Sequence, residues 1–166
     1  MLQLQPVMYK QQYLMLVEFC LFECDIVSLC LPNLEEVRCD GFRTYKKNAQ
    51  PILDMFEPNL IFSEQTNHYV GEELEYPNEV YYYNTLGLSN EPFNMVESIY
   101  DWRYPDFPED LCFFKGEICW FKSIAHENMA FIYDDSQETK GHLTWLGFHY
   151  LEDEAYEPPR RATFDT

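Results

Sequence analysis

The sequence predicts an α+β fold, a single domain with a mostly antiparallel sheet of about five to seven strands and helices packed on one side. Three observations lead to this prediction. The length of 166 residues suits one domain, and 46% apolar residues suffice for a packed core. Short β-branched and aromatic runs alternate with segments of helical spacing. We assign residues 1–151 to the domain and residues 152–166 to an acidic, proline-containing C-terminal tail.

The N-terminal part combines helices with one strand. The continuous apolar run within residues 10–21 suits either a buried strand or a helix, and we expect a helix. Residues 25–31 form the clearest strand, because their β-branched and apolar content is typical of a strand covered on both faces and stops at Pro32. Asn33 is a candidate N-cap of a short helix that ends near residues 40–41.

The middle of the chain predicts a helix followed by two strands. Apolar residues recur at helical spacing within residues 45–56, and Pro51 is compatible with this helix if its regular part begins close to the proline. Residues 59–70 and 80–83 favour strands, because β-branched and aromatic side chains suit a pleated surface. The polar residues 71–78 predict a connection, so the two strands should pair antiparallel.

A further helix and a three-stranded meander are expected next. Residues 89–92 combine a capping side chain, an early carboxylate and a proline, which is typical of a helix start. The buried face of this helix would be supplied by Phe93, Val96, Ile99 and Tyr100. Three apolar runs joined by short polar turns then predict the meander, at residues 111–114, 118–124 and 129–133.

The last elements are a short helix and an edge strand. Ser136 is a candidate N-cap of a helix that continues through Leu146, with Gly141 as a weak point in its middle. Residues 148–151 favour a strand that returns to the edge of the sheet.

The first residues indicate a cytoplasmic protein, and this location bears on the cysteines. The start carries no basic residue and Glu18 interrupts the first apolar run, so we expect neither a secretory signal nor a membrane span. Thiols in the cytoplasm stay reduced, and their spacing here matches no zinc motif. We therefore expect no cofactor or metal, and structural thiols at Cys20, Cys24, Cys30, Cys39, Cys112 and Cys119.

The charge balance limits the classes of partner. Lysine and arginine total 11 against 29 aspartates and glutamates, which gives a formal charge of −18. Binding to nucleic acid or to an anionic membrane requires clustered basic residues, so both are disfavoured. Between residues 64 and 110, eleven carboxylates accompany Arg103 as the single base. Either they form a solvated face that serves solubility, or they attract a basic protein to interleaved aromatic anchors.

The second interpretation names a set of candidate partner-binding residues. It predicts that carboxylates steer a basic protein to the site while an aromatic side chain anchors it. The candidates are Glu72, Glu73, Glu75, Glu79, Asp101, Trp102, Asp106, Glu109 and Asp110.

An enzyme is the alternative, and it would use His126 and Glu127 with a neighbouring Cys119 or Ser123. The sequence shows no complete catalytic constellation for it, because the zinc-protease pattern would need a histidine where Ala130 stands. A role for the His126–Glu127 pair in stabilising a turn is the simpler interpretation. A housekeeping module with no single partner is the third possibility.

Several segments within residues 20–134 resemble a group of small acidic bacterial proteins, mostly from Firmicutes. Its members often carry the automatic label of a stage III sporulation protein AH-like protein. The most specific segments are residues 108–114, Pro-Glu-Asp-Leu-Cys-Phe-Phe, and the pair His126-Glu127. Residues 23–28, 31–36 and 100–102 add to the likeness.

Small acidic proteins of this type resemble immunity proteins of bacterial toxin systems. The resemblance thus implies a non-enzymatic inhibitor that blocks a basic partner such as a toxin nuclease. It implies no catalytic residue.

Overall fold

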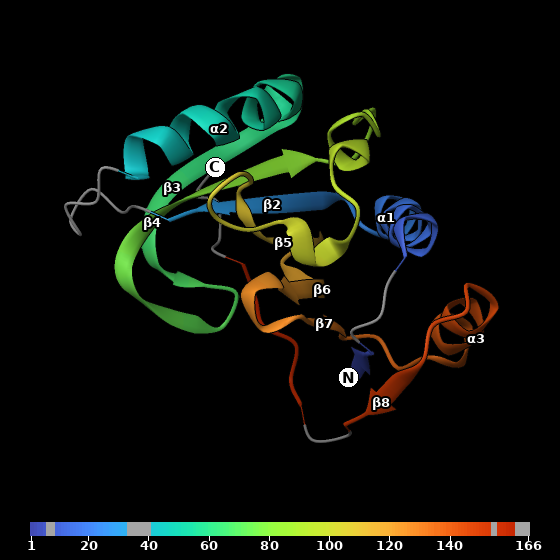
Figure 1. Cartoon of the computed structure of the whole chain (residues 1–166). Coiled ribbons are helices and arrows are strands. Elements are labelled where there is room, and N and C mark those ends of the chain that lie inside the picture. The colour runs from blue at the N-terminus through green and yellow to red at the C-terminus, as the bar shows by residue number, and fades with distance from the viewer. Residues whose placement is uncertain (6–8, 33–40, 154–155, 162–166) are drawn as a thin grey trace.

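The structure is a computed structural model that describes residues 1–5, 9–32, 41–153 and 156–161 (Figure 1). Within these residues the α-helices are α1 (Lys10–Glu23), α2 (Gly41–Phe56) and α3 (Gln137–Trp145). The strands are β1 (Leu2–Leu4), β2 (Ile26–Leu31), β3 (Leu60–Tyr69), β4 (Glu72–Asn84), β5 (Glu109–Lys115), β6 (Ile118–Ile124), β7 (Met129–Ile132) and β8 (Tyr150–Glu152).

All described strands belong to one sheet in the order β3-β4-β2-β5-β6-β7-β1-β8, and every neighbouring pair is antiparallel. The α+β class and the antiparallel sheet are therefore confirmed. The predicted number of strands was too low, because the short β1 escapes a pattern search. An isolated bridge between Ile118 and Arg160 adds a further strand contact.

The helices cover one face of the sheet, where the main core lies. Buried side chains of α1, α2 and α3 share this core with residues of the central strands, such as Val27, Leu29 and Phe113. A smaller cluster lies on the other face and includes Cys30, Val80, Tyr82, Cys112, Phe114 and Cys119. The strand β2 is buried along its whole length, as its apolar composition predicts, because it contributes to both clusters.

The hairpin of β3 and β4 is longer than expected. The antiparallel pairing is confirmed, but most of residues 71–78 belong to β4 and the turn lies at Val70 and Gly71. Two register shifts interrupt the pairing, between Leu60 and Phe62 and between Thr66 and His68. Bulges of this kind bend and twist a strand, and the hairpin curls across the sheet toward its second face (Figure 1).

One predicted helix begins earlier than expected, and another lies outside the described residues. The helix α2 begins at Gly41, so Pro51 lies in its interior. Burial of an apolar face that includes Tyr45, Ile52 and Phe56 favours the helix in spite of the missing hydrogen bond. The helix expected at residues 34–40 lies outside the described residues.

The helix expected after residues 89–92 is replaced by two short 3-10 turns, Pro92–Met95 (η3) and Ile99–Asp101 (η4). Its four apolar residues are nevertheless buried in the main core. The Ser98 side chain accepts the N–H of Tyr100, and Asp101 accepts the N–H groups of Glu97 and Ser98. Such local bonds compete with a continuous helix.

The C-terminal half confirms the remaining elements. The strands β5, β6 and β7 form the predicted meander, and Ser136 Oγ accepts the N–H of Thr139 at the start of α3. The strand β8 lies at the sheet edge beside β1. Within the segment assigned to a tail, the residues near Pro159 contact the sheet, since the N–H of Cys119 donates to the Pro159 carbonyl over 2.9 Å.

Candidate binding site

The turn of the β3–β4 hairpin packs against the C-terminal segment. Val70 and Gly71 have φ angles of 45° and 83°, a left-handed conformation that glycine adopts at no steric cost. A Cβ atom at Gly71 would lie 3.1 Å from the Cβ of Pro159. The turn therefore needs a glycine both for its backbone angle and for this close approach.

Tyr69 attaches the hairpin to the centre of the sheet. Its hydroxyl shares a hydrogen bond of 2.9 Å with Ser28 Oγ and donates to the carbonyl oxygen of Asp110 over 2.8 Å. Ser28 is buried in β2, and Asp110 lies at the start of β5. One buried hydroxyl thus connects three strands, which keeps the curl of the hairpin in place.

Lys122 on β6 holds the same end of the hairpin. The residue is only 4% exposed, and its Nζ donates to the Val70 carbonyl over 3.2 Å and pairs with the carboxylate of Glu72. A buried ammonium group is costly unless it is paired. The charge of Glu72 is therefore balanced inside the molecule.

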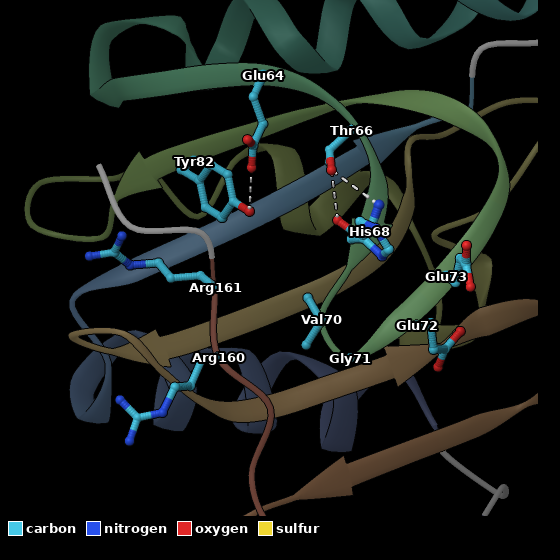
Figure 2. A pocket seen from close by; sticks show the side chains of 10 residues that line it. All are labelled: Glu64, Thr66, His68, Val70, Gly71, Glu72, Glu73, Tyr82, Arg160 and Arg161. Atoms are coloured by element: carbon cyan, nitrogen blue, oxygen red, sulfur yellow. Dashed lines mark hydrogen bonds between the residues drawn. The ribbon is translucent and has the colours of Figure 1, made fainter. Parts of the chain in front are cut away.

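A hollow of about 450 Å³ lies between the curled hairpin and the C-terminal segment. In Figure 2, Arg160 and Arg161 extend on one side of this hollow, Glu72 and Glu73 lie on the other, and His68 lies between them. Glu64 lies on β3 and accepts a hydrogen bond of 3.3 Å from the Tyr82 hydroxyl. The hairpin side of the hollow is thus acidic and can bind cationic groups, while the C-terminal side carries two guanidinium groups.

Four of the predicted partner-binding residues lie together on β4. Glu73 is exposed at the hollow, next to Glu72. Glu79 lies further along the strand and accepts a hydrogen bond of 2.6 Å from the Tyr81 hydroxyl. The side chain of Glu75 lies outside the described atoms, although its backbone belongs to β4.

The structure gives Asp101 and Trp102 roles inside the fold. Trp102 is 0% exposed, and its Nε1 donates to the Tyr13 hydroxyl over 3.0 Å. It therefore presents no surface to a partner in this conformation. The Asp101 carboxylate accepts two backbone N–H groups, at 3.0 Å and 2.8 Å, and so stabilises a turn. Asp106 is exposed and accepts a hydrogen bond of 3.3 Å from Asn48.

Glu109 and Asp110 are partly buried at the start of β5. Burial raises the pKa of both carboxyl groups, to about 6 for Asp110. The backbone N–H of Ala125 donates to Asp110 Oδ1 over 2.8 Å and opposes this effect. His126, when it is protonated, also favours the ionised form of both groups. These two carboxylates are therefore weaker candidates for attracting a partner than the exposed ones on the hairpin.

The His126–Glu127 pair lies in a 3-10 turn, η5 (Ala125–Glu127). Its Nε2 and Oε1 atoms are 3.8 Å apart, and both side chains are exposed. Neither proposed nucleophile suits the enzyme hypothesis. Ser123 is buried and donates to the Leu111 carbonyl, and burial raises the pKa of the Cys119 thiol. A thiol held in the protonated form is a poor nucleophile.

The five described cysteines are buried and free, as expected for structural thiols, and Cys39 lies outside the described residues. The described part of the chain contains no group of three His, Cys, Asp or Glu side chains placed to hold a metal ion. None of its helices has the length and apolar character needed to cross a membrane.

Sequence reasoning missed several residues of the hollow. Glu64 belongs to the acidic segment of residues 64–110, but its position beside Tyr82 depends on the register of β3 and β4. Arg160 and Arg161 lie about ninety residues further along the chain, and no local pattern connects them to the hairpin. Lys122 follows Phe121 in an apolar run, and a lysine within a buried strand is the one signal that could have indicated an internal ion pair.

Comparison with known proteins gives this chain no relative. No family model matches it. No curated protein matches it, and neither does any solved structure.

Proposed function

We propose that this chain is a non-enzymatic acidic binding protein, of the immunity or inhibitor type, that blocks a basic partner such as a toxin nuclease. The observation that carries this proposal is the charge of the curled hairpin. From residue 60 to residue 84 it contains five glutamates and no lysine or arginine. Clustered charge of one sign steers an oppositely charged protein and speeds its association.

The placement of the hairpin supports the same function. Tyr69 and Lys122 attach its far end to the sheet, so Glu64 and Glu73 are held on a structured surface. A rigid arrangement of charges loses less entropy on binding than a mobile one. Basic toxins that act on nucleic acid bind phosphates through clustered lysine and arginine, and an acidic protein surface can occupy such a cluster in their place.

The first step of the test is to find the partner. Tagged protein would be used to capture proteins from a lysate of the source organism at about 50 mM and about 300 mM salt. We expect a basic protein whose capture weakens at the higher salt, because screening reduces attraction between exposed charges.

The second step measures association rates with the purified partner. Replacing Glu64, Glu73 and Glu79 with glutamine should slow association about tenfold at low salt and flatten its salt dependence. A control variant with glutamine at the exposed Glu18, Glu91 and Glu138 loses the same charge away from the hairpin. Equal slowing of both variants would contradict a hairpin site, because it would show that only the total charge matters.

The enzyme alternative has one observation in its favour. Asp110 has a pKa of about 6, and perturbed carboxyl groups occur often at active sites. It faces the backbone N–H of Ala125, however, and both nearby candidate nucleophiles are buried. A binding function therefore fits these contacts better.

A further inference from the structure

The strand β3 forms one edge of the described sheet and carries the features of a docking edge. This ten-residue strand pairs with β4 on one side, and β3 is the first strand in the sheet order. Natural proteins protect long edges with lysine, proline, bulges or short strands, and the bulges of β3 lie at the two ends of its pairing with β4. The strand β3 contains neither lysine, arginine nor proline, and Ile61 on it is 46% exposed.

The pairing of β3 with β4 has no register shift from residue 62 to residue 66. Ser63 and Gln65 in this stretch have exposed side chains. A regular pleat places alternate N–H and C=O groups at the spacing that a further strand needs. The bulges at both ends limit this regular edge to about five residues.

The charges beside this edge indicate the chemistry of an added strand. A hollow of about 310 Å³ is lined by Ser63, Glu64, Gln65, Glu79 and Tyr81. Tyr81 donates to Glu79 over 2.6 Å, and Tyr82 donates to Glu64 over 3.3 Å. Because Tyr81 and Tyr82 are consecutive in β4, their side chains lie on opposite faces of the hairpin. Tyr81 therefore holds Glu79 on one face, and Tyr82 holds Glu64 on the other.

We propose that the basic partner of this protein adds an extended strand to the edge of β3, so that its lysine or arginine side chains meet Glu64 and Glu79. The inference rests on the proposed function and specifies how the partner binds. A second copy of this chain is disfavoured as the occupant, because pairing β3 with itself would bring two hairpins without any lysine or arginine together, in molecules with a charge of −18 each.

The test uses a defined probe, a blocked heptapeptide of lysine, whose side chains point to both faces of an extended strand. Two analogues carry backbone N-methyl groups, one on the odd-numbered residues and the other on the even-numbered residues. In an extended strand, N–H groups of alternate residues point to the same edge, so each analogue blocks one edge and keeps all charges. We expect one analogue to bind at least about tenfold more weakly than the parent peptide and the other to bind within about twofold.

Hydrogen exchange locates the contact. In the complex with the parent peptide, backbone amides at alternate positions within residues 62–66 should be protected, because a new strand accepts hydrogen bonds only from outward N–H groups. Glu64→Gln should weaken peptide binding about threefold, whereas Glu138→Gln on the exposed surface of α3 should leave it unchanged.

Several results would overturn strand addition. They are the absence of peptide binding at about 50 mM salt, equal affinities of the two N-methyl analogues, or bound peptide without protection of residues 62–66. Protection of these amides that grows with protein concentration alone would assign the edge to a second copy. A captured basic partner together with equal affinities of the analogues would leave the proposed function intact and overturn only the binding mode.

Discussion

Asp110 shows how burial changes the chemistry of a single residue. Its carboxyl group is partly buried at the start of β5 and accepts the N–H of Ala125. The backbone of Asp110 has a φ angle of 53°. Burial raises its pKa to about 6, above the ordinary value of 3.8. The folded state therefore binds the proton more tightly than the unfolded state does, so this group's contribution to stability falls as the pH rises from about 4 to about 6.

We therefore expect Asp110→Asn to increase the free energy of unfolding at pH 7.5 by about 1–2 kcal/mol. Asparagine keeps an oxygen that accepts the Ala125 N–H, tolerates positive φ and carries no charge to desolvate. The gain should shrink toward zero near pH 4. Urea unfolding at several pH values measures it.

The exposed Asp135→Asn serves as the matched control and should change stability by less than about 0.5 kcal/mol. A destabilised Asp110→Asn variant at pH 7.5 would show instead that the ionised carboxylate is needed for its bond to Ala125.

At the scale of elements, the hairpin turn and α3 place two glycines in opposite situations. Gly71 has a φ angle of 83° and little room beside Pro159. Gly141 lies inside α3, and a Cβ atom there would meet nothing within 4 Å. Alanine should therefore have opposite effects at the two positions, because one backbone is left-handed and the other helical.

We expect Gly71→Ala to lower the free energy of unfolding by about 1–2 kcal/mol, through strain in the turn and the contact with Pro159. Gly141→Ala should raise it by about 0.5–1 kcal/mol. Denaturant unfolding of both variants provides the comparison. Stabilisation by Gly71→Ala would contradict the described turn.

Elements with a strong local pattern were predictable from the sequence. The strand β2 was identified by its dense β-branched and apolar run, and α3 by the Ser136 cap. The turns η3 and η4 were expected to form a helix, because the apolar spacing of their buried residues suits a helical face. Side-chain bonds from Ser98 and Asp101 compete with that helix, and such bonds depend on local geometry.

The whole molecule carries a formal charge of −18, and folding brings the charged groups close together. Mutual repulsion of like charges destabilises the compact state, and dissolved salt screens it. Within the described residues, ion pairs such as Lys10–Glu97 and Lys140–Glu152 relieve only a small part of this excess.

We expect the melting temperature to rise by about 2–5 °C when sodium chloride increases from about 10 mM to about 200 mM, because screening weakens the repulsion. Scanning calorimetry at fixed pH measures this shift. A melting temperature that falls with salt would show that attractive ion pairs outweigh the repulsion among carboxylates.

The sequence by itself determined the α+β class, the meander of β5 to β7, and the acidic character of the chain. These properties depend on composition and on patterns between near neighbours. Only the tertiary structure decided which carboxylates face solvent. It buried Trp102 in the core, paired Glu72 with Lys122, and placed Arg160 and Arg161 across the hollow from the hairpin. These contacts join residues far apart in the chain, and the curl of the hairpin that forms them depends on how the whole sheet packs.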